Sequence, residues 1–272
     1  MAIITISRGT MSGGKKLAHM LADKLGYKCL SREIIIKAAD DYGIEEDKLF
    51  EAIRSSPSII QKLTFEREHY LAYIQASICE YAKDDNLIYH GHAGHFLLTG
   101  ISHVLRIRII ADMPYRIKAA MEQQGLTSKE AEKYIKRVDK ERIKWTKFLY
   151  GKDWTSAELY DMVINLENTD LDSICQLVLC SVKQSRFKTT TESTKSMNDL
   201  LIASRVRAAL AGISQIRLGN LDIKANDGEV IIQGRSRSQE ISDSILKVAS
   251  KVPGVNKLTT KVEVDYRSFK IE

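Results

Sequence analysis

The chain has 272 residues, of which 44% are hydrophobic and 28% are charged. This length predicts one large domain or two unequal ones, and the composition is that of a globular protein rather than a disordered or fibrous one. No apolar run approaches the roughly 18 residues that a membrane-spanning helix needs. The amino terminus lacks the basic and long apolar regions of a secretory signal, so we expect a cytoplasmic protein. The four cysteines form no CxxC pair, which favours reduced thiols over a zinc site or a disulfide framework.

The net charge is +6, and it is unevenly distributed. Residues 1–182 contain 25 basic and 25 acidic residues, residues 183–197 contain 4 and 1, and residues 198–272 contain 12 and 9. This balance is typical of a small-molecule enzyme with an appended module that meets an anionic surface, although a solvated linker explains the same charges.

Short apolar strands alternate with amphipathic helices along the first two thirds of the chain. We predict strands at residues 2–6, 27–30, 87–90, 104–111 and 160–166. The segments between them have helical patterns, notably 38–86, 114–124 and 128–145, and a last helix starts at Asp170. Such alternation predicts βαβ units and an α/β fold in which helices cover a parallel sheet.

The segment 185–196 is rich in Ser and Thr and has a single large apolar residue, so we expect a linker over 183–197. Beyond it we predict a small α+β domain over 198–272, in the order helix, strand, strand, helix and strand. Asp227 and Gly228 lie between two alternating runs and predict a hairpin turn. The larger domain is expected to cover residues 1–182.

A glycine-rich segment, G-T-M-S-G-G-K-K, follows the first predicted strand. It comprises Gly9, Thr10, Met11, Ser12, Gly13, Gly14, Lys15 and Lys16. Its spacing fits the phosphate-binding pattern GxxxxGK in the required strand–loop–helix setting. Backbone N–H groups of such a loop surround phosphate oxygens, and Lys15 would bridge the transferred phosphoryl group. The alternative is an ordinary βα turn with a solvated lysine.

Lys16 stands where a hydroxyl group normally holds Mg²⁺ in such loops. We therefore expect ATP oxygens, water and a carboxylate elsewhere in the chain to hold the ion.

The segment ITISRGTMSGGKKLAHMLADKLGYKCLSREII resembles the opening of the cytidylate kinase-like proteins, a branch of the P-loop nucleoside monophosphate kinases. The resemblance continues through LIYHGHAGHFLL, VLRIRIIADMPYRI, KRVDKERIKW, and GKDW followed by YDMVIN. It implies a P-loop kinase that uses ATP and Mg²⁺. It also implies transfer of the γ-phosphoryl group to a nucleoside monophosphate, CMP or dCMP.

The same resemblance implies an acceptor site after the second and third strands. Arg32 and Lys37 match the basic residues that hold the acceptor phosphate, although an exposed helix start explains them equally well. Where the family has G-R-G or G-R-D, this chain reads H-G-H-A-G-H, so His92 replaces an arginine and is expected to line the acceptor pocket. His90, His92 and His95 do not have the sequence spacing of metal ligands, and no metal site is predicted there.

The predicted helix 128–145 resembles the lid of these kinases. Asp139 and Arg142 keep the family's i, i+3 spacing, and Arg137 precedes them. By resemblance, Arg137 and Arg142 stabilise the charge on the transferred phosphoryl group, and Asp139 orients the lid. A solvated helix face with i, i+4 ion pairs is the alternative.

Residues 198–266 resemble a BON domain through SRVRAALAG, LDIKANDGEVIIQG, QEISDSILKVASKVPGV and TTKVEV. The resemblance implies a phospholipid or protein partner, and the basic excess favours anionic lipid. Nucleic acid is not expected, because no stripe of alternating aromatic and basic residues is present. The main hypothesis is thus a nucleoside monophosphate kinase. The alternative is a catalytically weak ATP-binding regulatory protein whose BON-like module binds a lipid or protein partner.

Overall fold

The structure is a computed structural model that describes residues 2–54, 62–91, 94–167 and 169–265. Their internal contacts divide them into two compact units. The first is built mainly from residues 2–33 and 84–190, and the second from residues 34–52, 62–83 and 191–265. No helix of the described residues is long and apolar enough to cross a membrane.

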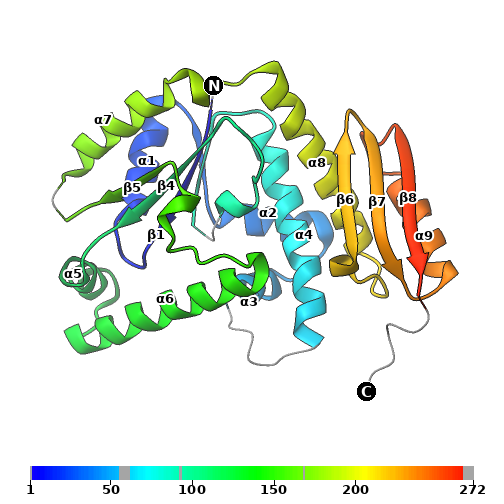
Figure 1. Ribbon diagram of the computed structural model, residues 1–272. Coiled ribbons are helices and arrows are strands. Elements are labelled where there is room, and N and C mark those ends of the chain that lie inside the picture. Colours follow the sequence, from blue (N-terminus) through cyan, green and yellow to red (C-terminus); the bar gives the residue numbers. More distant parts are fainter. Residues whose placement is uncertain (1, 55–61, 92–93, 168, 266–272) are drawn as a thin grey trace. The chain divides into compact units, whose positions relative to one another are not determined.

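A five-stranded parallel sheet forms the centre of the first unit (Figure 1). Its strands lie in the order β2 (Lys28–Leu30), β3 (Leu87–His90), β1 (Ile3–Arg8), β4 (Val104–Ile110) and β5 (Met162–Asn165). Strand β1 pairs with β3 on one side and with β4 on the other, so it is the central strand. Because the strands are parallel, their carboxyl ends meet at one edge, where the loop after β1 lies.

Helices flank this sheet and confirm the predicted α/β fold. The helices of the first unit are α1 (Gly14–Leu25), α5 (Met113–Gln124), α6 (Ser128–Tyr150) and α7 (Leu171–Val182). Helices α1 and α7 share an apolar core with β1 and β4, to which Leu17, Ile107 and Val178 contribute. Helix α6 begins with a capping box between Thr127 and Glu130 and extends five residues past its predicted end.

The second unit combines helices from two distant parts of the sequence. Helices α2 (Glu33–Tyr42), α3 (Glu46–Arg54) and α4 (Lys62–Ala82) are inserted between β2 and β3. The C-terminal part contains α8 (Thr191–Ala211), β6 (Leu221–Asn226), β7 (Glu229–Ser236), α9 (Gln239–Ala249) and β8 (Lys257–Val264).

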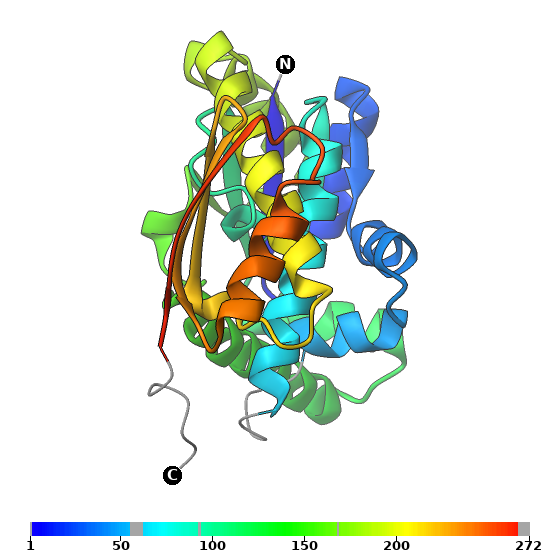
Figure 2. The same cartoon turned by 90° about the vertical axis from the view of Figure 1, so that its right-hand side faces the viewer.

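The C-terminal sheet has the order β6-β7-β8, with β6 and β7 antiparallel and β7 and β8 parallel. The predicted hairpin is confirmed: Asp227 and Gly228 both have positive φ, 51° and 78°, as a tight two-residue turn requires. Figure 2 shows α8 and α9 on one face of this sheet.

Helix α8 begins inside the segment that we expected to be a linker. From Thr191 onward the chain is helical, and the side chains of Ser193 and Met197 are buried. Helix α8 packs against α4, with Arg205 Nε 2.5 Å from Glu80 Oε1 and Cys79 Sγ 3.6 Å from Ser204 Oγ. Burial against another helix therefore outweighs the polar composition of the segment, which by itself favours a coil.

Candidate active site

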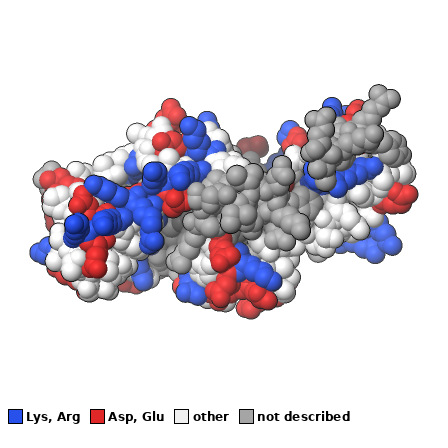
Figure 3. Space-filling model, turned by 90° about the horizontal axis from the view of Figure 1, so that it is seen from below, with Lys and Arg blue, Asp and Glu red and all other residues white. Residues whose placement is uncertain are grey.

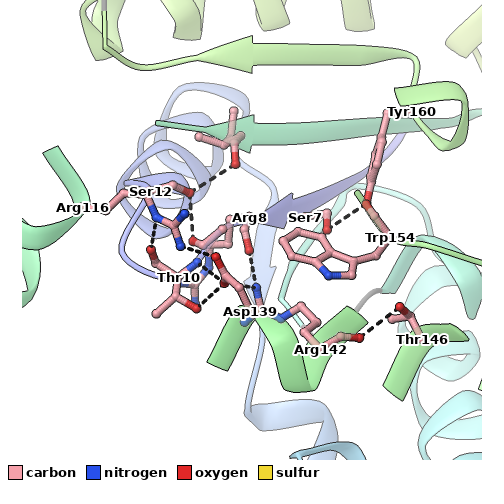
Figure 4. A network of polar contacts seen from close by, with 12 residues as sticks. Ser7, Arg8, Thr10, Ser12, Arg116, Asp139, Arg142, Thr146, Trp154 and Tyr160 are labelled. Carbon is pink, nitrogen blue, oxygen red and sulfur yellow. Dashed lines mark hydrogen bonds and ion pairs between the residues drawn. The ribbon is translucent and has the colours of Figure 1, made fainter. Parts of the chain in front are cut away.

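The glycine-rich loop joins the carboxyl end of β1 to α1, and its shape is fixed by Ser12 (Figure 4). The Ser12 hydroxyl is fully buried and lies 2.9 Å from the Gly9 carbonyl oxygen and 3.2 Å from that of Ile109 in β4. Its backbone N–H donates to the Gly9 carbonyl oxygen at 3.2 Å. Both donors of Ser12 are thus used inside the protein.

The loop backbone leaves the first N–H groups of α1 uncapped. Gly13, the residue before α1, has a φ of 81° and provides no side-chain cap. A Cβ atom at Gly13 would lie 2.6 Å from Leu166 Cδ1, so both the conformation and the space require glycine here. Met11 also has a positive φ, 62°, which is strained for a residue with a side chain. An uncapped helix start beside Lys15 and Lys16, both exposed, is suited to bind phosphate.

A cleft of about 610 Å³ opens beside the loop, between α1 and α5. Its walls carry the cationic side chains of Arg8, Lys15, Lys16 and Lys118. Burial lowers the pKa of Arg8 below its ordinary value, and its Nε atom is buried without a hydrogen-bond partner in the described part of the chain. An anionic group in the cleft would supply that missing partner.

Helices α5 and α6 contact the loop through one polar network (Figure 4). Asp139 Oδ1 accepts hydrogen bonds from the backbone N–H of Thr10 at 3.1 Å and from its hydroxyl at 2.7 Å. Asp139 Oδ2 forms an ion pair with Arg116, whose Nε donates to the Thr10 carbonyl oxygen at 2.7 Å. Asp139 of α6 therefore contacts both the loop and an arginine of α5.

Arg142 lies next to this network, one helical turn beyond Asp139. Its NH1 donates to the Arg8 carbonyl oxygen at 2.5 Å, and its guanidinium carbon lies 4.9 Å from the ring centre of Trp154. Arg108 approaches the same ring at 5.0 Å. Burial lowers the pKa of Arg142 to about 10, so the side chain remains protonated at neutral pH. The cation is thus held beside the loop by a carbonyl oxygen and an aromatic ring.

The glycine-rich loop and the helix α6 that contacts it are accompanied by a sequence match over most of the first unit. The profile of the cytidylate kinase-like family matches residues 3–168. The chain belongs to the cytidylate kinase-like family. A BON domain matches residues 198–266.

Individual proteins similar to this family member include two named cytidylate kinase. The chain is 26% identical over 168 residues to a cytidylate kinase of Ignicoccus hospitalis, covering 61% of this chain and 90% of that protein. It is 24% identical over 189 residues to a cytidylate kinase of Methanopyrus kandleri, covering 66% of this chain and 92% of that protein. The solved structure of an uncharacterized protein from Eubacterium ventriosum has a TM-score of 0.52 at 22% identity, covers 68% of this chain and 99% of its own, and supports the fold alone.

The acceptor-site residues expected of a cytidylate kinase-like protein are only partly described. Arg32 is exposed in the turn before α2, and Lys37 lies on α2 with its Nζ 2.8 Å from Asp41 Oδ1. Arg32 belongs to the first compact unit and Lys37 to the second. His92 lies outside the described residues.

The lid residues of this family member divide into two groups. Asp139 and Arg142 reach the loop, whereas Arg137 is exposed, and no polar contact in the described part of the chain joins it to them. Exposed pairs such as Lys136–Glu132 give this side of α6 the mixed charge of a solvated face. Figure 3 shows Lys and Arg gathered beside Asp and Glu on the side where α6 lies.

Sequence patterns did not single out Arg116 or assign a role to Trp154. Arg116 lies in the first turn of α5, just after the carboxyl end of β4, where side chains of a parallel sheet commonly converge on a ligand. This position was the only feature of the sequence that could have indicated a role for Arg116. Trp154 belongs to the GKDW segment, and its contact with Arg142 depends on the tertiary fold.

Of the three histidines in the H-G-H-A-G-H segment, His90 and His95 lie in the described part of the chain, and both are buried. Burial lowers the pKa of His90 to about 4 and that of His95 to about 3, so both rings are neutral at physiological pH. The His95 ring packs 4.0 Å from Phe96 and 4.8 Å from Tyr160, measured between ring centres. His95 is therefore part of the apolar packing.

Proposed function

We propose that this protein is a kinase that transfers the γ-phosphoryl group of ATP to a nucleoside monophosphate. The observation that carries the proposal is the contact between the phosphate loop and the lid helix through Asp139 and Thr10. Phosphoryl transfer needs little covalent chemistry from a protein, because positioning and charge stabilisation supply most of the rate enhancement. A loop of phosphate-binding shape with Arg142 beside it supplies both.

The residues around the loop divide these tasks. The N–H groups at the start of α1 and the Lys15 ammonium group bind the β- and γ-phosphates. Arg142 offers five N–H donors, of which its bond to the Arg8 carbonyl oxygen uses one, so it can also contact the transferred phosphoryl group. Asp139 keeps α6 over the loop and orients Arg116. Arg137 would join them only after a movement of the lid.

The residues present fit ATP better than they fit a directly bound Mg²⁺. Lys16 provides no hydroxyl, and the Asp139 carboxylate is occupied by Thr10 and Arg116. Phosphate oxygens and water would therefore hold most of the Mg²⁺ coordination shell. The ion would neutralise charge on the phosphates, while the protein contacts those phosphates through its cations.

Family membership supports CMP or dCMP as the acceptor, with Arg32, Lys37 and His92 as candidate contacts. An imidazole at position 92 has fewer donors than the arginine of the family pattern. We therefore expect selectivity among monophosphates to be broader than in relatives that have the arginine.

An acceptor panel tests this proposal. ADP release is measured with ATP, Mg²⁺ and each of CMP, dCMP, UMP, AMP and GMP, for the wild type, Lys15→Ala and the control Lys24→Ala on the exposed side of α1. We expect turnover with a cytidine monophosphate, its loss in Lys15→Ala and its retention in Lys24→Ala. ATP binding without turnover of any acceptor would instead support the regulatory alternative.

The BON module is proposed to interact weakly with anionic lipid. Ion pairs such as Lys224–Asp222 and Lys257–Glu229 neutralise part of its basic excess. Any attraction should fade with salt, since exposed charges are screened over about 8 Å at physiological ionic strength. Co-sedimentation of the full chain with phosphatidylserine vesicles at two salt concentrations checks this. Absence of salt-sensitive binding would favour a protein partner.

A further inference from the structure

Three side chains with metal-binding atoms converge beside the phosphate loop. His19 lies on α1, Cys29 on β2, and His90 at the end of β3. One ligand atom from each residue lies within 4.8 Å of the other two. The residues are far apart in sequence, so the pairing of β2 with β3, and the packing of α1 against both strands, create the cluster.

The donor set is suited to zinc. A thiolate and two imidazoles are common ligands of Zn²⁺, with bond lengths of about 2.3 Å to sulfur and 2.0 Å to nitrogen. In a tetrahedral site such bonds place the ligand atoms roughly 3.3–3.7 Å apart. The observed separations are at most 4.8 Å, so the three atoms would have to move closer together when they bind an ion. Cys29 is a free thiol, as this use requires.

An independent observation at His90 supports a ligand here. The His90 side chain is only 4% exposed, and its Nδ1 atom is buried without a hydrogen-bond partner in the described residues. Buried ring nitrogens normally have a partner. A metal bound by the cluster fixes the orientation of this ring and offsets the cost of burying its polar atoms.

The charges around the cluster are of both signs. Lys15 and Arg8 are positive neighbours, while Glu33 and Asp23 are negative neighbours that act on Cys29 or His90. The Cys29 thiolate adds another negative charge when it binds. His19 is exposed and also lines the cleft between α1 and α5, which gives an ion a path from solvent.

We propose that His19, Cys29 and His90 form a Zn²⁺ site with one thiolate and two imidazole ligands, and with a fourth position open to water. Binding forms one Zn–S and two Zn–N bonds. The Cys29 thiol releases its proton to solvent, and no oxidant or reductant is needed. The site is separate from the loop donors that bind phosphate and does not depend on kinase activity.

Cobalt spectroscopy tests the site in the full chain, which should be free of tags, reduced and stripped with a chelator. Co²⁺ is titrated while visible and near-ultraviolet absorption is recorded, and Zn²⁺ is then added as a competitor. We expect one equivalent of Co²⁺ to give tetrahedral d–d bands and a thiolate-to-cobalt charge-transfer band, both of which Zn²⁺ removes.

Variants assign the ligands. Cys29→Ser should abolish the charge-transfer band, and His19→Ala should weaken Co²⁺ affinity at least tenfold. Cys180→Ser, which removes an exposed thiol elsewhere, should leave both unchanged. His19 is exposed, so its variant should fold, and circular dichroism checks each protein. A wild type without a thiolate–cobalt band, or a band that persists in Cys29→Ser, would overturn the proposal.

Discussion

Asp139 of α6 and Thr10 of the phosphate loop are 129 positions apart in sequence and are joined by two hydrogen bonds, of 3.1 and 2.7 Å. The same carboxylate pairs with Arg116. Lid, loop and α5 are therefore mechanically linked through one side chain. A carboxylate so placed sets the position of α6, and with it the position of Arg142 one turn further along.

We expect Asp139→Ala to lower kcat more than it raises the KM for ATP, because Arg142 loses its fixed position while the loop donors remain. It should also lower the free energy of unfolding by about 1–3 kcal/mol, since several hydrogen bonds to a partly buried charge are lost. Steady-state kinetics and urea unfolding measure both effects. The control Glu132→Gln changes an exposed pair on the same helix. Unchanged kcat in Asp139→Ala would contradict this role.

Trp154 is expected to be a positioning residue for Arg142. The guanidinium carbons of Arg142 and Arg108 lie 4.9 and 5.0 Å from the centre of its ring, and removing the ring leaves Arg142 without one of its supports. Trp154→Leu should reduce kcat with little change in the KM for ATP, and Trp154→Phe should restore part of the loss because it keeps an aromatic face. Phe148→Leu, at an exposed position on α6, is the control. If the Leu and Phe variants had equal turnover, the aromatic contact would not position Arg142.

Stability should fall as the pH drops from about 6.5, because His95 is buried in a neutral form. Its folded pKa is about 3, below the ordinary value near 6.5 of an unfolded chain. Between these values the unfolded chain binds a proton that the folded chain does not, so acid favours unfolding. Both ring nitrogens of His95 are buried without a partner among the described residues.

The wild type should lose stability between pH 7 and pH 5 that His95→Leu does not lose. We therefore expect the free energy of unfolding of His95→Leu, relative to that of the wild type, to be about 1–2 kcal/mol higher at pH 5 than at pH 7. Urea unfolding at three pH values measures this, with Met121→Leu, at an exposed position on α5, as the control and a chelator present throughout. Parallel pH profiles for the wild type and His95→Leu would show that His95 titrates normally.

Truncation after Val182, the end of the larger predicted domain, should remove a packing partner of that domain. Helix α4, inserted in the family segment, belongs to the same compact unit as α8 and contacts it through Glu80 and Arg205. We expect truncation after Val182 to expose the buried side of α4 and to lower stability or cause aggregation. Thermal unfolding and size-exclusion chromatography of both chains check this. A monomeric truncated protein with an unchanged melting temperature would contradict it.

A double-mutant cycle examines the same contact without truncation. Glu80 and Arg205 are each 27% exposed, so their coupling should be modest, about 0.5–1 kcal/mol. The free energies of unfolding of Glu80→Gln, Arg205→Gln and the double variant are measured. If the effects of the two single substitutions simply add up in the double variant, the ion pair contributes nothing to stability.

The elements of the first unit were predictable because their signals are local. Buried parallel strands read as short apolar runs, and the glycine-rich loop has a fixed spacing after β1. The beginning of α8 at Thr191 was not predictable in this way, since a polar segment becomes helical only through its packing. The same holds for the site: Lys15 and Asp139 lie in recognisable motifs, whereas Arg116, Trp154 and the cluster around Cys29 are defined by contacts between distant segments.

Direct transfer of labelled phosphate tests the central claim. ATP labelled at the γ-position is incubated with CMP, Mg²⁺ and either the wild type or Arg142→Ala, and labelled CDP is quantified over time. We predict that the wild type forms CDP and that Arg142→Ala forms it roughly 100- to 1,000-fold more slowly, as expected for the loss of a group that stabilises transition-state charge. A wild type that binds ATP but labels neither CMP nor any other monophosphate, or an Arg142→Ala variant with full activity, would contradict the account.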